Sequence, residues 1–97
     1  MIVQRMSVRA KPGHRDEVVD LLKAERARMD DPGRMRILAG GIGTAWNTVV
    51  YELTAKNVTE NEQKWQEWAG RPGMAEFWQK WIQVADDWSD EVWEIVE

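Results

Sequence analysis

Hydrophobic and polar residues alternate over residues 2–10, and this period of two predicts a half-buried β-strand. The sequence Lys11-Pro12-Gly13 then interrupts the pattern, because proline lacks a backbone donor and glycine favours turns. Apolar residues next recur at helical spacing and predict a helix over about 15–29, which Asp30-Asp31-Pro32-Gly33 ends. The chain therefore opens with a strand followed by a helix.

Two further strands are predicted in the middle of the chain. Residues 35–42 are mostly apolar, although two glycines weaken the strand. Residues 46–54 are rich in β-branched and aromatic side chains and form the strongest strand pattern in the sequence. Only Gly43-Thr44-Ala45 separates the two segments, so together they predict a β-hairpin.

The rest of the chain predicts two helices and a final strand. Thr59 and Glu62 have the spacing of a capping box, which begins a helix that runs to about Gly70. An amphipathic stretch over 74–88 predicts a third helix, and alternation over 91–96 predicts the last strand.

The resulting order, β-α-β-β-α(α)-β, is the ferredoxin-like pattern of the α+β class. With right-handed crossovers it gives an antiparallel sheet that has the helices on one face and the first strand between the third and the fourth. The length of 97 residues and the lack of an interdomain linker predict a single domain over residues 1–97.

The helices leave one face of this sheet uncovered. We expect the helix-facing side to carry Met6, Val8, Val49, Tyr51, Leu53, Trp93 and Ile95. We expect the far face to carry Val3, Arg5, Ser7, Trp46, Thr48, Val50, Glu52, Val92, Glu94 and Val96. An exposed face with this many apolar groups usually marks an interface, and a second copy of the sheet is the simplest cover. The sequence therefore predicts a homodimer through the sheet face.

On the far face, Arg5 is expected to lie between Glu52 and Glu94 on the neighbouring strands. An arginine between two carboxylates in a half-buried cavity suits an anionic or polar ligand. The arrangement is more often a structural ion pair at a dimer interface, because buried charges must be paired whether or not they bind a ligand.

Six of the seven tryptophans lie between Trp65 and Trp93. Trp65 and Trp68 share one helix face, and Trp78 and Trp81 share another. Large rings that pack beside small residues can leave a cavity, so the stripe predicts either core packing or a ligand site between sheet and helices. In the second interpretation Tyr51 supplies a polar group for a small apolar or aromatic ligand.

Composition narrows the possible functions. The chain has no cysteine, which excludes disulfides and thiolate metal sites, and its net charge of −4 argues against nucleic acid as a partner. No apolar run approaches the ~18 residues of a membrane span. Met1 leads directly into a strand pattern with no signal peptide, so we expect a cytoplasmic protein without membrane or nucleic-acid partners.

Motifs for cofactors and metals are missing from the sequence. The single histidine, His14, has no cluster of further ligands around it, so we expect no metal site. The paired acids lie at expected helix ends and turns and lack EF-hand spacing. There is no P-loop, Rossmann or Gly-x-Ser-x-Gly motif, and we therefore expect no cofactor.

Three segments resemble a known family. The opening MSVRAKPGHRDEVVDLL resembles the first strand, turn and first helix of the dimeric α+β barrel superfamily. WNTVVYEL resembles the third strand of its NIPSNAP-type and antibiotic-biosynthesis-monooxygenase-type branches, and RPGMAEFWQKWIQVADDWSDEVWEIV resembles the NIPSNAP-type ending. The resemblance implies two ferredoxin-like protomers packed sheet to sheet, with a ligand pocket between each sheet and its helices.

The resemblance leaves three functions open. The first is a NIPSNAP-like protein that binds a small apolar or aromatic ligand. The second is a cofactor-free monooxygenase that positions an aromatic substrate with Trp, Tyr, Asn and Arg, which Trp46, Asn47, Tyr51 and Arg5 would provide here. The third is a structural dimerisation module. Haem-degrading relatives use a helix histidine as the iron ligand, and His14 at the start of the first helix does not match that position.

Overall fold

The computed structural model describes all 97 residues of the chain. Four antiparallel strands form one sheet, namely β1 (Ile2–Ala10), β2 (Met35–Ala39), β3 (Thr48–Ala55) and β4 (Ala85–Glu94). The helices are α1 (Arg15–Ala27), α2 (Val58–Ala69) and α3 (Met74–Val84), with a short 3₁₀ helix, η1 (Pro32–Arg34).

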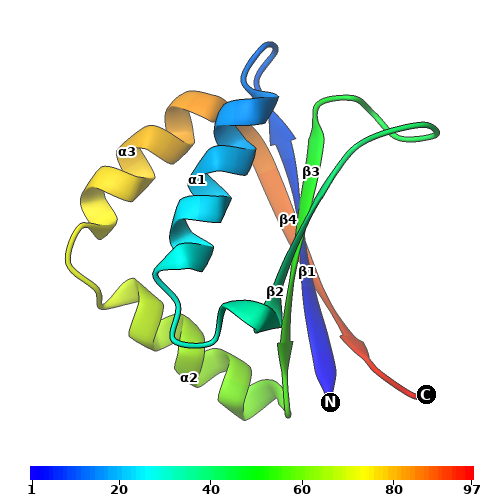
Figure 1. The fold of residues 1–97 in the computed structure, drawn as a ribbon, viewed down its shortest axis with the longest axis vertical. Helices are drawn as coiled ribbons and strands as arrows, with labels where there is room; N and C mark the ends of the chain where they lie inside the picture. The colour runs from blue at the N-terminus through cyan, green and yellow to red at the C-terminus, as the bar shows by residue number, and fades with distance from the viewer.

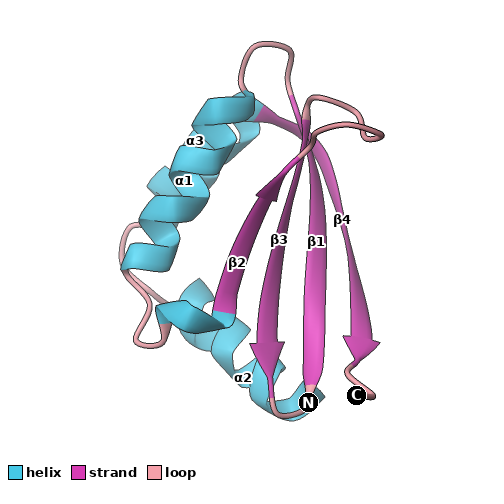
Figure 2. Cartoon of the chain, turned by 45° about the vertical axis from the view of Figure 1, so that its right-hand side comes forward, coloured by secondary structure: helices cyan, strands magenta, loops and turns pink.

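The strands lie in the order β2-β3-β1-β4, which places the first strand between the third and the fourth. The three α-helices cover one face of the sheet, and the opposite face is bare (Figure 1). When the molecule is turned, the four strands are seen side by side, with α1 and α3 to their left and α2 behind their lower ends (Figure 2). The α+β class and the ferredoxin-like topology predicted from the sequence are therefore confirmed.

The cap of α2 differs from the sequence prediction. The side chain of Asn57 accepts a hydrogen bond from the backbone N–H of Glu60 at 2.9 Å. The carboxylate of Glu60 accepts one from the backbone N–H of Lys56 at 3.3 Å. Asn57 is therefore the N-cap residue in place of Thr59, and Glu60 reaches back to the residue before the N-cap, so the predicted capping box of Thr59 and Glu62 is wrong.

The boundary between α3 and β4 was predicted wrongly. We expected the helix to continue to Trp88 and the strand to cover 91–96, but α3 ends at Val84 and β4 begins at Ala85. The acids Asp86-Asp87 would be unfavourable at a helix C-terminus, where the macrodipole is negative. As a strand, the segment pairs along the whole of β1.

The residues of β4 lie on the opposite faces of the sheet from those that the sequence predicted. Val3 pairs with Trp93 and Arg5 pairs with Glu91, and directly paired residues point to the same face. Trp93 therefore lies on the far face and not on the helix side, and Glu91 replaces Glu94 as the neighbour of Arg5. A shift of one residue in register moves every side chain of a strand to the other face.

Four residues expected on the far face lie elsewhere. Val92 and Glu94 pair with Gln4 and Ile2 on the helix side of the sheet. Trp46 lies in the loop before β3. Val96 lies beyond the end of β4, as does Ile95, which was expected on the helix side.

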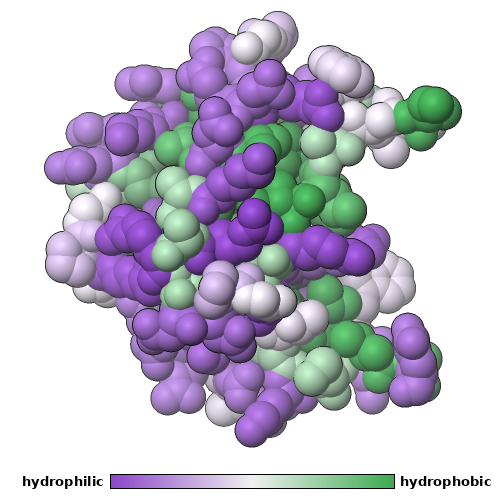
Figure 3. Space-filling view, viewed as in Figure 1, coloured by the Kyte–Doolittle hydropathy of each residue, from purple (hydrophilic) through white to green (hydrophobic).

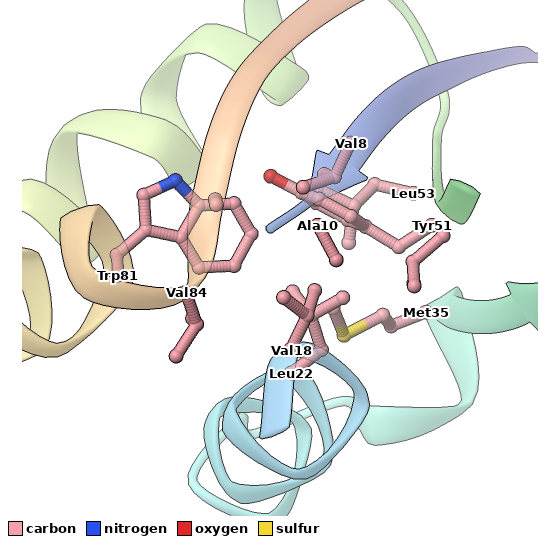
Figure 4. Packing of buried hydrophobic residues seen from close by; sticks show 11 residues of the cluster. Val8, Ala10, Val18, Leu22, Met35, Tyr51, Leu53, Trp81 and Val84 are labelled. Atoms are coloured by element: carbon pink, nitrogen blue, oxygen red, sulfur yellow. The ribbon is translucent and has the colours of Figure 1, made fainter. Parts of the chain in front are cut away.

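The hydrophobic core fills the space between the sheet and the helices (Figure 4). Val8, Val18 and Val49 are fully buried in it, and Trp81 is 3% exposed. The remaining tryptophans are half-buried or exposed. The tryptophan stripe is thus only partly core, and most of its rings surround a space next to the core.

Candidate ligand-binding site

A cavity of about 160 Å³ lies between the sheet and the helices. Of its 19 lining residues, 12 are hydrophobic, and they come from both layers of the fold. The sheet contributes Met6, Met35, Tyr51, Leu53 and Trp88, and the helices contribute Leu22, Trp65, Trp68, Phe77, Trp78 and Trp81.

Six aromatic rings form a continuous wall of this cavity. Trp68 packs edge-on against Trp65 and Phe77, with ring centroids 5.4 and 5.2 Å apart. Phe77 stacks on Trp81 at 5.6 Å, and Trp81 lies edge-on to Trp88 at 5.9 Å. Such pairs contribute about 0.5–1.5 kcal/mol each beyond their buried area, so they hold one another in place. The sixth ring, Trp78, stacks on Trp88, with ring centroids 6.3 Å apart.

A buried amide network fixes the wall to the sheet. Oε1 of Gln4 on β1 accepts hydrogen bonds from Nδ2 of Asn61 at 2.7 Å and Nε1 of Trp65 at 2.5 Å. Nε2 of Gln4 donates to Asp90 on β4 at 2.9 Å. The polar edge of the Trp65 ring is therefore already bound to protein.

Four buried polar groups of the cavity lining have no hydrogen-bond partner in the protein. Two of them, Oε2 of Glu25 and Nη1 of Arg71, belong to charged side chains at the edge of the cavity. Nε1 of Trp81 is buried without a hydrogen bond. The hydroxyl of Tyr51 forms no hydrogen bond with the protein. The Tyr51 ring reaches from β3 toward Trp81 and α3 (Figure 4). Burial, with a smaller effect from the charge of Asp90, raises the pKa of Tyr51, so its hydroxyl stays protonated at neutral pH.

Charged residues line one edge of the cavity. At this edge the end of α1 lies near η1, α2 and the α2–α3 turn. This charged rim consists of Glu25, Asp30, Asp31, Arg34, Lys64, Glu67 and Arg71. Desolvation lowers the pKa of Arg34, and Asp31, Glu60 and Glu67 oppose that shift. Nη2 of Arg71 donates to the backbone oxygen of Arg28 at 3.0 Å and ties the turn to the end of α1.

Five of the ten site residues proposed from the sequence line this cavity: Tyr51, Trp65, Trp68, Trp78 and Trp81. Arg5 and Glu52 lie on the far face of the sheet, Glu94 lies at the end of β4, and Trp46 and Asn47 lie in the loop before β3. Phe77, Trp88 and the charged rim were not predicted to belong to the site. Glu25 gave a usable signal, since this acid occupies a position on the apolar stripe of α1 and is buried there.

Trp46 and Asn47 hold the loop and do not face the cavity. The guanidinium of Arg15 lies 4.1 Å from the ring centroid of Trp46. Nδ2 of Asn47 donates to the backbone oxygen of Ala10 at 3.1 Å. Since Arg5 and Tyr51 point to opposite faces of the sheet, Trp46, Asn47, Tyr51 and Arg5 do not converge on one substrate within the chain.

The far face carries a row of alternating charges that crosses all four strands. Its members are Arg36 on β2, Glu52 on β3, Arg5 on β1 and Glu91 on β4. Nη2 of Arg36 lies 2.6 Å from Oε1 of Glu52, Nη2 of Arg5 lies 2.7 Å from Oε2, and Nη1 of Arg5 lies 4.0 Å from Glu91. Desolvation raises the pKa of Glu52, but the hydrogen bonds from both arginines outweigh this effect and hold the pKa below its usual value.

The structure contains no group of three or more His, Asp or Glu side chains arranged to hold a metal ion. None of its helices combines the length and the apolar character that crossing a membrane requires.

The fold is shared with proteins of known structure at low sequence identity. A NIPSNAP family protein from Agrobacterium tumefaciens superposes with a TM-score of 0.83 at 14% identity, over 99% of this chain and 93% of that one. A NIPSNAP domain protein from Burkholderia xenovorans superposes with a TM-score of 0.77 at 13% identity, over 99% and 95%. An antibiotic biosynthesis monooxygenase-like protein from Deinococcus radiodurans gives 0.71 at 11% identity, over 100% and 94%.

No family model matches the sequence, and no curated protein does. The structural neighbours bear out the resemblance to the NIPSNAP-type and monooxygenase-type fold, and one from Agrobacterium tumefaciens is described as a NIPSNAP family protein of unknown function. At these identities the likeness concerns the fold.

Proposed function

We propose that this protein binds a small, flat, largely apolar ligand in the cavity between its sheet and its helices. The observation that carries the proposal is the aromatic wall around about 160 Å³ of space. An engineered apolar cavity of about 150 Å³ in another protein holds benzene, so this space suits a single ring with a small substituent.

The cost of an empty cavity supports the same conclusion. Lining atoms that face empty space lose dispersion contacts. The cavity of about 160 Å³ is partly open to solvent, and a fitting flat ligand would restore those contacts.

Calorimetric titration with toluene, benzaldehyde and indole tests the proposal. We expect saturable binding of at least one of these compounds and a rise in melting temperature at saturation. Met6→Phe places a larger side chain beside the cavity and should weaken binding, whereas Ile82→Phe on the exposed side of α3 should not. If none of the three compounds binds at millimolar concentration, the proposal is wrong.

We also propose that the far face packs against a second copy of the chain. Leu38 and Trp93 are exposed on this face. Val50 pairs with Leu38 on one side of the charge row, and Val3 pairs with Trp93 on the other side. The face is hollowed between the loop before β3 and the C-terminal end, and hydrophobic side chains gather there (Figure 3). Exposed apolar surface of this kind favours association.

The charge row favours one particular symmetry. A twofold axis parallel to the strands, between β3 and β1, would place Arg36 opposite Glu91 of the second copy and Glu52 opposite its Arg5. An axis perpendicular to the strands would place each charge opposite itself. Because like charges in an interface are costly and opposite charges set its register, the first arrangement is favoured.

A further inference from the structure

The unpartnered donors of the cavity restrict the chemistry of its ligand. Nε1 of Trp81 belongs to a side chain that is 3% exposed and has no hydrogen-bond partner. By contrast, Nε1 of Trp65 on the same wall is bound by Gln4. Buried polar groups in folded proteins nearly always have a partner, so an orphaned indole beside a cavity indicates that the partner occupies the cavity.

The hydroxyl of Tyr51 is a second donor in the lining, and it differs from the indole in that it is reachable from the cavity. Its residue is 8% exposed and lines the same cavity, and burial raises the pKa of the phenol. The hydroxyl therefore keeps its proton at neutral pH and can donate it in a hydrogen bond. An indole N–H can only donate, so a group that satisfies both residues must be an acceptor.

The surroundings of these donors select a neutral acceptor. The nearest lining residues from the sheet and α3 are apolar or aromatic, and an anion without a charged partner is poorly solvated there. The cationic members of the charged rim are Arg34, Lys64 and Arg71. They come from η1, α2 and the α2–α3 turn and not from β3 or α3. Nη1 of Arg71 is also buried without a partner, but it belongs to this rim and not to the part of the lining that β3 and α3 provide.

We propose that the ligand is a flat ring that carries a carbonyl oxygen, and that Trp81 and Tyr51 donate hydrogen bonds to this oxygen. The inference rests on the proposed ligand-binding function and names the chemical class of its ligand, a small aromatic aldehyde or ketone. A ligand without an acceptor leaves both donors buried and unsatisfied, so such a site discriminates strongly against it.

The test compares toluene with benzaldehyde, which have similar size and differ in the carbonyl oxygen. Calorimetry should show at least tenfold tighter binding of benzaldehyde. In ¹H–¹⁵N spectra, the indole resonance of Trp81, assigned with Trp81→Phe, should move downfield with benzaldehyde and not with toluene. The resonance of Trp65 is the internal control, since its N–H is already bound.

Tyr51→Phe removes only the hydroxyl and should reduce the preference for benzaldehyde severalfold while toluene binds as before. Because the hydroxyl has no protein partner, the variant should melt no lower than the parent. Equal affinities for the two ligands, or a preference that survives in both Tyr51→Phe and Trp81→Phe, would overturn the inference and leave the ligand-binding proposal standing. Failure of both ligands to bind would overturn both.

Discussion

Nε1 of Trp65 donates a hydrogen bond to Oε1 of Gln4 at 2.5 Å, which joins α2 to the central strand of the sheet. The same oxygen accepts a hydrogen bond from Asn61 at 2.7 Å. Gln4 thus positions one end of the aromatic wall and orients the Trp65 ring, whose polar edge is turned to the sheet. This polar network therefore supports one end of the aromatic wall.

We expect Gln4→Ala to lower the free energy of unfolding by about 3 kcal/mol, because the donors of Asn61 and Trp65 are then buried without a partner. Urea unfolding followed by circular dichroism measures the change. Gln63→Ala, at an exposed position of α2, is the matched control and should alter stability by less than about 0.5 kcal/mol. Equal effects of the two substitutions would contradict a structural role for Gln4.

The carboxylate of Glu52 should make stability depend on pH in the acidic range. Hydrogen bonds from Arg5 and Arg36 outweigh desolvation and lower its folded pKa, so the unfolded chain takes up the proton first. The stabilisation is therefore fully present above the ordinary glutamate pKa of about 4.3 and is lost as the pH falls through the lower folded value.

Glu52→Gln should lower stability at pH 7 by about 1 kcal/mol, since an amide accepts the same hydrogen bonds without charge. It should also flatten the decline of stability between about pH 5 and pH 2. Melting temperatures measured across this range test both points. Glu62→Gln, on the exposed side of α2, should leave the decline unchanged; a parental pH profile in Glu52→Gln would count against this assignment.

The proposed dimer symmetry predicts that reversing the charges of Arg36 and Glu91 together restores the dimer affinity that either reversal alone weakens. Within a chain, Arg36 on β2 and Glu91 on β4 are separated by two strands, or about 14 Å at the usual strand spacing. Arg36→Glu or Glu91→Arg alone should weaken the dimer about tenfold or more by placing like charges together. The double variant should recover most of the affinity, since the opposed charges are again of opposite sign.

Sedimentation velocity of the parent, both single variants and the double variant completes this cycle, with melting temperatures to check that each variant is folded. A double variant that dimerises more weakly than either single variant would exclude the strand-parallel axis. A monomeric parent at all accessible concentrations would exclude the dimer itself.

Adjacent glycines in the loop before β3 should respond in opposite ways to alanine. A Cβ at Gly40 would lie 2.5 Å from the backbone oxygen of Ala45, whereas a Cβ at Gly41 meets no atom within 4 Å. Gly40→Ala should therefore cost about 1–3 kcal/mol, because backbone must shift to accommodate the methyl group. Gly41→Ala should be neutral or slightly stabilising, within about 0.5 kcal/mol. Thermal unfolding of the pair checks this, and equal melting temperatures would refute it.

Local patterns were sufficient for the class of fold. The alternation over residues 2–10 and the amphipathic stretch over 74–84 reflect which side of each element is buried, and burial is recorded in the order of residues. The order of these elements then leaves few possible topologies. The strand order and the bare face of the sheet could therefore be predicted.

The sequence alone determined these elements and the presence of an aromatic cluster, because both follow from residue types at close spacing. Only the tertiary structure decided that Ala85 begins a strand, that Glu91 and not Glu94 neighbours Arg5, and that Trp81 keeps a free N–H beside a cavity. The register of β4 depends on pairing with β1 between residues that lie 75 to 92 positions apart in the sequence. The volume of a cavity is the small difference between the space that several elements enclose and the side chains that fill it, and no local pattern records that difference.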